Sequence, residues 1–191
     1  MALLAPVLLI DENYIKNYTW LNDSVDATLL KPAILLAQDK HLQEVIGTDL
    51  YQAIINGIRN NNLSTDLQTL INNYIMIAVC WWTIYEVAPH LYIKTDNGSL
   101  MIRTSSDTQS VTDANVQDYR NQARESAVFY TNRMIDFLWK NSGLYVAYTT
   151  NNENQLWSNP RANKSVVMEI GQARPDHSAM WKFMVGAKYY Q

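Results

Sequence analysis

Apolar residues between residues 65 and 88 recur at helical spacing and cover more than one side of the helix that they predict. A helix that is apolar on several sides is buried by other elements, so we expect this segment to form the centre of the core. Thr65 and Gln68 fit a capping box at its start, and Pro89 predicts its end. Its apolar positions are Leu67, Leu70, Ile71, Tyr74, Ile77, Ala78, Trp81, Trp82, Ile84 and Tyr85.

Two helices are expected before this central helix. The first spans Thr28–Ile46 and tolerates Pro32 if its regular part begins there. Gly47 fits a left-handed αL cap at its end, and Thr48 or Asp49 fits the N-cap of a shorter second helix, which ends in a run of three asparagines. The tight connection predicts that these two helices meet at an angle.

Beyond the central helix the pattern changes to short β-prone runs on either side of Asn97-Gly98, which predict a small β-hairpin near residues 91–103. A solvated loop should follow over residues 104–110. A second long helix is then expected from Thr112 or Asp113 to residues 141–143. Its apolar stripe comprises Val116, Tyr119, Ala123, Ala127, Tyr130, Met134 and Leu138.

The two ends of the chain lack a sustained helical period. We interpret residues 1–24 as an N-terminal arm and loop rather than a targeting signal, because the apolar run lacks a basic leader. Residues 25–143 form the helical domain, and residues 144–191 form an extended C-terminal arm. Large aromatic side chains on an extended arm are costly to leave in water, so we expect them to dock on another subunit. They are Trp157, Trp181, Phe183, Tyr189 and Tyr190.

The fold class that follows is mainly α: an antiparallel helical bundle with a small β-hairpin and an extended C-terminal arm. The 191 residues suit a single domain. A net charge of −3 gives no basic field that would hold the protein on nucleic-acid phosphates, so tight DNA binding is disfavoured. Asn72, Asn73 and Glu86 interrupt the apolar run of the central helix, so we expect it to be buried in protein rather than in a membrane.

Candidate chemistry is sparse. His41 and Glu44 have a helical spacing that suits a metal, but no second such pair occurs, and a structural role for His41 is favoured. Cys80, the only cysteine, is expected to be a small buried hydrophobe. The sequence contains no nucleophile-elbow, phosphate-loop or zinc-protease motif. We therefore expect no enzymatic activity, no cofactor and no metal.

Two side-chain groups could serve binding instead. The adjacent Trp81 and Trp82 could form a ligand platform, although their rings should diverge by about 100° on a helix, and core packing is favoured. Arg120, Arg124 and Arg133 are expected on the face of the second long helix opposite its apolar stripe. They could form an interface or channel face, whereas a solvated face is the simpler interpretation.

The order of these segments resembles that of bacteriophage head-to-tail connector proteins, the adaptor rings beneath the portal, and most of all those of crAss-like phages. The resemblance rests on LLID near the start, LLKPAILLAQDKHLQEVIGTDLYQAI, LINNYIMIAVCWWTIYEVAPHLYIK, the NG turn and the FLW at the end of the long helix. Its most distinctive part is residues 34–51, with the IGTDLY corner. It covers about the first three quarters of the chain and does not extend to the segment after Tyr148.

This resemblance implies a structural virion protein at the portal vertex, assembled in the host cytoplasm. Copies would stand side by side in a ring, typically a dodecamer, and contact the portal and neighbouring tail or ring proteins. DNA would pass through the channel as non-specific cargo, and no membrane would be involved. Two alternatives stay open: a tail-completion or stopper ring, and a small helical regulatory or ligand-binding module that uses the groove around Trp81, Trp82 and Tyr85.

Overall fold

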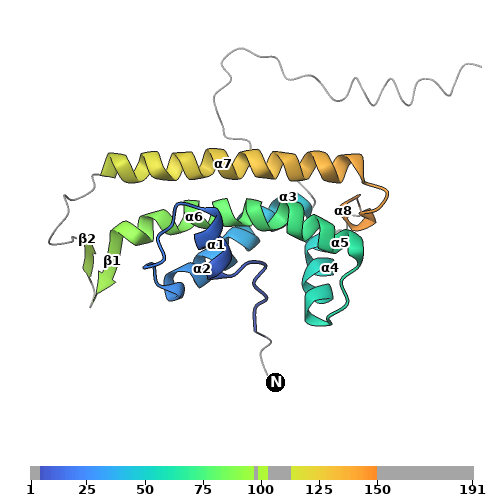
Figure 1. Ribbon diagram of the computed structural model, residues 1–191, viewed down its shortest axis with the longest axis horizontal. Coiled ribbons are helices and arrows are strands. Elements are labelled where there is room, and N and C mark those ends of the chain that lie inside the picture. Colours follow the sequence, from blue (N-terminus) through green and yellow to red (C-terminus); the bar gives the residue numbers. More distant parts are fainter. Residues whose placement is uncertain (1–4, 97–98, 103–112, 150–191) are drawn as a thin grey trace, which may run out of the picture.

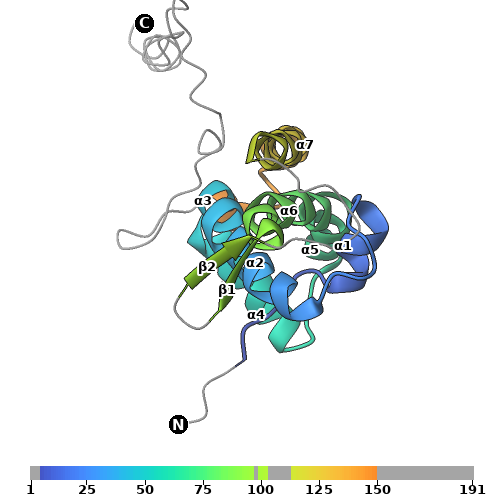
Figure 2. The ribbon, with the colours of Figure 1, turned by 90° about the vertical axis from the view of Figure 1, so that its left-hand side faces the viewer.

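The computed structural model describes residues 5–96, 99–102 and 113–149, and in these ranges the protein is mainly helical (Figure 1). Two long helical stretches lie side by side, and the shorter helices gather on one side of this pair (Figures 1 and 2). The helical elements are α1 (Glu12–Tyr18), α2 (Ala27–Ala37), the π-helix η1 (Gln38–Leu42), α3 (Gln43–Ile46), α4 (Thr48–Arg59), α5 (Thr65–Leu70), the π-helix η2 (Ile71–Ile75), α6 (Met76–Tyr92), α7 (Asp113–Lys140) and α8 (Val146–Thr149).

The central helix is present as the continuous series α5, η2 and α6, but both of its predicted ends are wrong. Its N-cap is Ser64, whose hydroxyl accepts a hydrogen bond from the Leu67 amide, so Thr65 is already helical. Pro89 lies inside α6 and the helix continues for three residues, with the Ile93 amide bonded to the Pro89 carbonyl. A proline removes only its own amide donor, and near a helix end that loss is tolerated when packing holds the turn.

The first predicted helix is likewise continuous from α2 to α3. It begins one residue before the predicted start, because the carboxylate of Asp26 caps it by accepting a hydrogen bond from the Thr28 amide at 2.9 Å. Its interior contains the π-helical turn η1, which nothing in the periodic pattern indicated. Such turns insert an extra residue and re-aim the side chains around them, often at functional sites.

The corner between α3 and α4 depends on Gly47. Its φ is positive, as predicted, but its dihedral angles of 80° and 161° are not those of the αL conformation. They fall in a region that essentially only glycine occupies. Gly47 itself is the N-cap of α4, so the cap does not fall on Thr48 or Asp49 as predicted.

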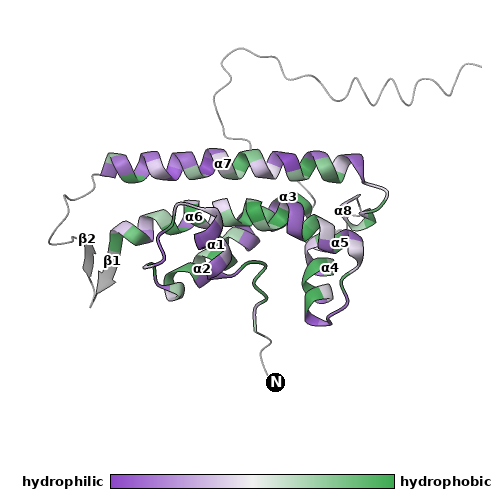
Figure 3. Ribbon diagram, viewed as in Figure 1, coloured by the Kyte–Doolittle hydropathy of each residue, from purple (hydrophilic) through white to green (hydrophobic). Residues whose placement is uncertain are grey.

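Helix α7 runs antiparallel to α5–α6 and covers its length (Figures 1 and 2). The predicted stripe is largely confirmed, since Ala123, Ala127, Met134 and Leu138 are buried. Thr131 and Ile135 are also buried and were not in that stripe. In Figure 3 the hydrophobic residues dominate α6, whereas α7 is mostly hydrophilic, as expected for a helix that covers a core with one side only.

Strands β1 (Ile93–Asp96) and β2 (Ser99–Ile102) pair antiparallel, with Ile93 opposite Ile102. The Asn97-Gly98 turn that the sequence predicts between them lies outside the described residues, so the complete hairpin stays an expectation. The same holds for the solvated loop at residues 104–110. Within the described residues, no helix combines the length and apolar character needed to cross a membrane.

The Gly47 geometry gives a sharp prediction. Gly47→Ala and Gly47→Asn should each lower the free energy of unfolding by about 1–3 kcal/mol, because no side-chain-bearing residue adopts this backbone conformation without strain. Urea denaturation followed by circular dichroism measures the change. Gly143→Ala is the matched control, since a Cβ there meets nothing within 4 Å. A Gly47→Asn variant as stable as the natural protein would indicate an αL cap instead.

Candidate functional site

A buried ion pair joins two elements that are far apart in the sequence. Nε2 of His41, on η1, lies 2.6 Å from Oε1 of Glu86, on α6, and both side chains are more than nine-tenths buried. Lys40 donates a second hydrogen bond to the same carboxylate oxygen at 2.9 Å, from a side chain that is 53% exposed. We call Lys40, His41 and Glu86 the polar junction.

The polar junction keeps Glu86 ionised despite its burial. Burial alone would raise the pKa of this carboxyl group, but the hydrogen bonds and positive charge supplied by His41 and Lys40 outweigh it and hold the pKa below its ordinary value. A buried charge without partners is costly, so these contacts fix the position of η1 on α6. The π-helical turn places Lys40 and His41 beside Glu86.

His41 also connects the polar junction to α7. Its ring stacks on Trp82 with centroids 3.8 Å apart and an angle of 8° between the planes. The indole N–H of Trp82 donates in turn to the hydroxyl of Thr131 at 3.0 Å, and both groups are buried. This series of contacts ties η1, α6 and α7 together, and explains why a threonine lies at a buried position of α7.

Gln38, at the start of η1, holds residues 7–9 against the same turn through two hydrogen bonds. Its side-chain oxygen Oε1 accepts a hydrogen bond from the Leu9 amide at 2.8 Å, and its side-chain NH₂ donates to the Val7 carbonyl at 3.1 Å. Gln38 is fully buried, and the neighbouring Leu9 and Ile10 are buried with it. The sequence does not predict this role, because a single glutamine in an apolar helix gives no periodic signal.

The chemistry of this centre is structural in character. The metal hypothesis paired His41 with Glu44, whereas the carboxylate that the imidazole contacts belongs to Glu86. No group of three or more His, Cys, Asp or Glu side chains that could hold a metal occurs in the described part of the chain. Cys80 is fully buried, and burial raises the pKa of its thiol to about 12, which confirms the interpretation as a small hydrophobe.

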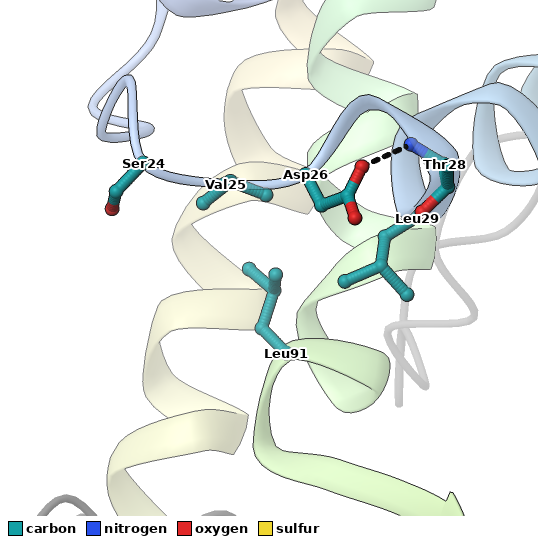
Figure 4. A pocket seen from close by; sticks show the side chains of 6 residues that line it. All are labelled: Ser24, Val25, Asp26, Thr28, Leu29 and Leu91. Atoms are coloured by element: carbon teal, nitrogen blue, oxygen red, sulfur yellow. Dashed lines mark hydrogen bonds between the residues drawn. The ribbon is translucent and has the colours of Figure 1, made fainter.

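A cavity of 480 Å³ lies beside the start of α2 (Figure 4). It is lined by Ser24, Val25, Asp26, Thr28, Leu29 and Leu91. The carboxylate of Asp26 is already engaged by the Thr28 amide, as the dashed line in Figure 4 marks. The remaining lining is aliphatic or hydroxyl-bearing, so the cavity brings together no pair of titratable groups that would suit catalysis.

Trp81 and Trp82 are both buried and face different neighbours, as their adjacent helical positions predict. Trp82 contacts His41, whereas Trp81 makes an edge-to-face contact with Trp20 at 5.1 Å. The predicted core role of both residues is confirmed. The stacked His41 ring covers one face of the Trp82 ring, so that face is not open to a ligand.

Trp20 belongs to a group of aromatic residues, which we call the aromatic face: Tyr14, Tyr18, Trp20, Phe129 and Tyr130. Tyr14 and Tyr18 stack at 4.4 Å, and Phe129 meets Tyr130 at 5.2 Å. Burial is the main cause that raises the pKa of Tyr14 to about 12, and Tyr130 lies close enough to contribute. The exposed fractions of Tyr18, Trp20 and Phe129 are 58%, 64% and 63%, so this face presents large apolar area to solvent.

A second exposed apolar group lies at the C-terminal end of α7. It comprises Trp139, Leu144 and Val146, each about three-fifths exposed, where α7 gives way to α8. Exposed apolar residues that occur singly are normal, but grouped ones mark interaction surfaces. The described structure therefore has two candidate contact surfaces, and neither was indicated by the periodicity of the sequence.

The three predicted arginines do not share one environment. The Arg120 guanidinium lies 4.2 Å from the centre of the Tyr85 ring, and that of Arg133 lies 5.4 Å from the Tyr74 ring. Arg120 is half-buried with a buried Nε, so its expected place on the solvated face is wrong. Arg124 is half-buried and Arg133 is exposed. Their role at an interface or channel stays a prediction.

The predicted docking residues of the C-terminal arm all fall within residues 150–191, outside the described residues. They are Trp157, Trp181, Phe183, Tyr189 and Tyr190.

The polar junction generates a stability prediction. Glu86→Ala should lower the free energy of unfolding by about 3 kcal/mol, because it leaves a buried imidazole without its partner. Lys40→Ala should cost less than about 1 kcal/mol, since the lysine side chain is half exposed. Chemical denaturation measures both. Equal effects of the two substitutions would show that burial does not govern this centre.

The same carboxylate makes stability depend on pH. The pKa of Glu86 is lower in the folded protein than in the unfolded chain, so the unfolded chain takes up the proton first as the pH falls. The stabilisation by the ionised carboxylate is therefore complete above its ordinary pKa of 4.5 and is lost as the pH drops through the folded value. We expect the stability difference between the natural protein and Glu86→Gln to shrink between pH 7 and pH 3. A constant difference in unfolding titrations would contradict this.

Comparison with known proteins places the chain in a family without assigning an activity. No curated protein matches it, and no solved structure matches it. One family description matches residues 42–156, which span α3 to α8 and therefore contain both long helical stretches, Glu86 and both tryptophans of α6. That match covers more than half of the 191 residues. The chain belongs to the family of unknown function DUF6712.

Proposed function

We propose that this protein is a structural component of a bacteriophage virion, a homo-oligomeric ring that connects the portal to the tail and lets the genome pass. The observation that carries the proposal is the pair of exposed apolar surfaces on an otherwise well-buried helical body. The polar junction satisfies the charge inside the core, and the apolar surface that stays exposed outside the core is available for assembly.

The positions of the two surfaces favour a ring. Helix α1 carries part of the aromatic face, and α8 carries part of the second surface. Both views place α1 and α8 apart in the molecule (Figures 1 and 2). A contact between the α8 end of one copy, after which the C-terminal segment begins, and the aromatic face of the next copy is heterologous. A heterologous contact that closes on itself generates a cyclic ring.

The remaining features of the fold class are part of this proposal. The predicted start of the extended arm at residue 144 is wrong, because Tyr145 and Tyr148 are buried in the core and residues 146–149 form α8. A complete hairpin at residues 91–103 and an extended arm beyond residue 149 would each supply contacts to a neighbouring copy, the portal or a tail protein. The apolar and aromatic residues of the arm would dock there. The resemblance of residues 34–51 to the corner of connector proteins supports the same assignment.

The charge of the body suits a passage for DNA. Residues 1–149 carry fifteen acidic and ten basic residues, a net charge of −5. Phosphates that pass a net-negative wall are repelled rather than held, so the genome would move as non-specific cargo. A protein that bound DNA tightly would need the opposite balance.

Native mass spectrometry of the purified protein, alone and with its portal protein, tests the proposal. We expect a closed ring, a dodecamer in the connector arrangement, and a complex of that ring with the portal, because the exposed apolar surfaces are buried on assembly. A chain that stays monomeric under all these conditions would contradict the proposal. A ring whose channel is blocked in an image of the assembly would identify a stopper instead.

A further inference from the structure

We propose that the aromatic face is the docking surface for the C-terminal segment, residues 150–191, of a second copy of this chain. The inference rests on the proposed ring and names the contact that would hold it together. Trp20 and Phe129 are the expected anchors, since each is nearly two-thirds exposed and aromatic side chains dominate the energetics of protein interfaces. Residues 150–191 contribute aromatic residues of the same kind, from Trp157 to Tyr190.

A buried polar atom beneath the face points to a missing contact. The indole Nε1 of Trp81 is buried and has no hydrogen-bond partner in the described structure. Trp81 is 8% exposed and is covered at 5.1 Å by Trp20, which is itself 64% exposed. Buried indole N–H groups normally find an acceptor. The carbonyl of a peptide that packs beside the exposed Trp20 ring would supply one.

Opposite charges favour this occupant over an unrelated apolar partner. Residues 150–191 carry five basic and three acidic residues, a net charge of +2. Residues 11–26, which include α1 and Trp20, carry four acidic residues and one lysine, a net charge of −3. The acidic side chains are Asp11, Glu12, Asp23 and Asp26. Complementary charge steers a segment to its site and excludes surfaces of the same sign.

The length of the segment and its starting point fit a second copy. The described chain ends at Thr149 in α8, and α1 lies elsewhere in the molecule in both views (Figures 1 and 2). The segment has 42 residues, which span up to roughly 140 Å when fully extended. That reach suffices for a neighbouring copy in a ring, where the C-terminal segment of each copy would dock on the aromatic face of the next.

The second exposed surface is a poorer docking site for residues 150–191. Trp139 lies next to Lys140, which has the same sign as the segment, and Leu144 and Val146 directly precede its attachment point. We therefore use Trp139 as the matched control: a large aromatic of equal exposure on the same helix as Phe129.

Photo-crosslinking of the full-length protein tests the inference. The photoreactive residue p-benzoylphenylalanine replaces Phe129 in one variant and Trp139 in the other, and each is mixed with isotope-labelled protein before illumination. Mass spectrometry then assigns every crosslink to one copy or to two. We expect position 129 to give mixed-isotope links to peptides of residues 150–191, about fivefold more than position 139 gives. Matching circular dichroism spectra establish that both variants fold.

Three results would overturn the inference. Links from position 129 that occur only within one copy would show that the segment folds back on its own body. Links from position 129 to helices of another copy would identify a body-to-body contact. Equal yields from positions 129 and 139 would show that the aromatic face is not preferred.

The outcome is separable from that of the proposed function. Mixed-isotope links to residues 150–191 in a protein that forms no closed ring would support the docking surface and contradict the connector. A ring that forms while position 129 links elsewhere would support the connector and overturn the docking surface. A second readout is Trp20→Ser, which should lower the link yield from position 129 without changing the helical content, whereas Trp139→Ser should leave that yield unchanged.

Discussion

The contact between His41 and Glu86 is the constraint on which the rest of this structure depends. A carboxylate buried in an apolar helix is stable only if polar partners reach it, and the π-helical turn η1 brings the Lys40 ammonium group and the His41 imidazole. Because the imidazole also stacks on Trp82, and Trp82 bonds to Thr131, one polar centre determines how three elements sit together. The surrounding aliphatic core then packs around fixed positions.

This centre gives the body a self-sufficient core and makes its exposed aromatic residues informative. A small domain with an incomplete core would expose apolar side chains simply because it lacks residues to cover them. Here the central helix is covered by α2, α7 and the N-terminal segment, so Trp20, Phe129 and Trp139 are not uncovered remnants of that core. The proposed assembly of copies would account for their exposure, which is why the proposed function is an assembly rather than a reaction.

The long helices were predictable from the sequence, because periodicity and burial agree over segments such as α5–α6 and α7, whereas α8 lies in a stretch that was predicted to be an extended arm. The ends of the helices were less predictable. Ser64 rather than Thr65 forms the N-cap of α5. Pro89 does not end α6, since packing against α7 outweighs the loss of one backbone hydrogen bond. Gly47 was correctly expected to have a positive φ, but its actual conformation depends on how α3 and α4 meet. Local patterns do not contain that information.

The site was harder to predict than the fold. His41 was paired with Glu44 because the two share one helix, whereas its actual partner lies 45 residues away. The available signal was Glu86 itself, a lone acidic residue in an apolar run, which requires a buried cation from some other element. The aromatic face was not predictable, because Trp20 and Phe129 come from separate elements and only the tertiary structure shows which rings stay exposed.

The most direct test of the account is a comparison of the full-length protein with a chain that ends at Thr149, by sedimentation velocity and circular dichroism. The account predicts that the shorter chain keeps its helical content and cooperative unfolding but no longer assembles as the full-length chain does. Loss of helical structure, or assembly equal to that of the full-length protein, would contradict it.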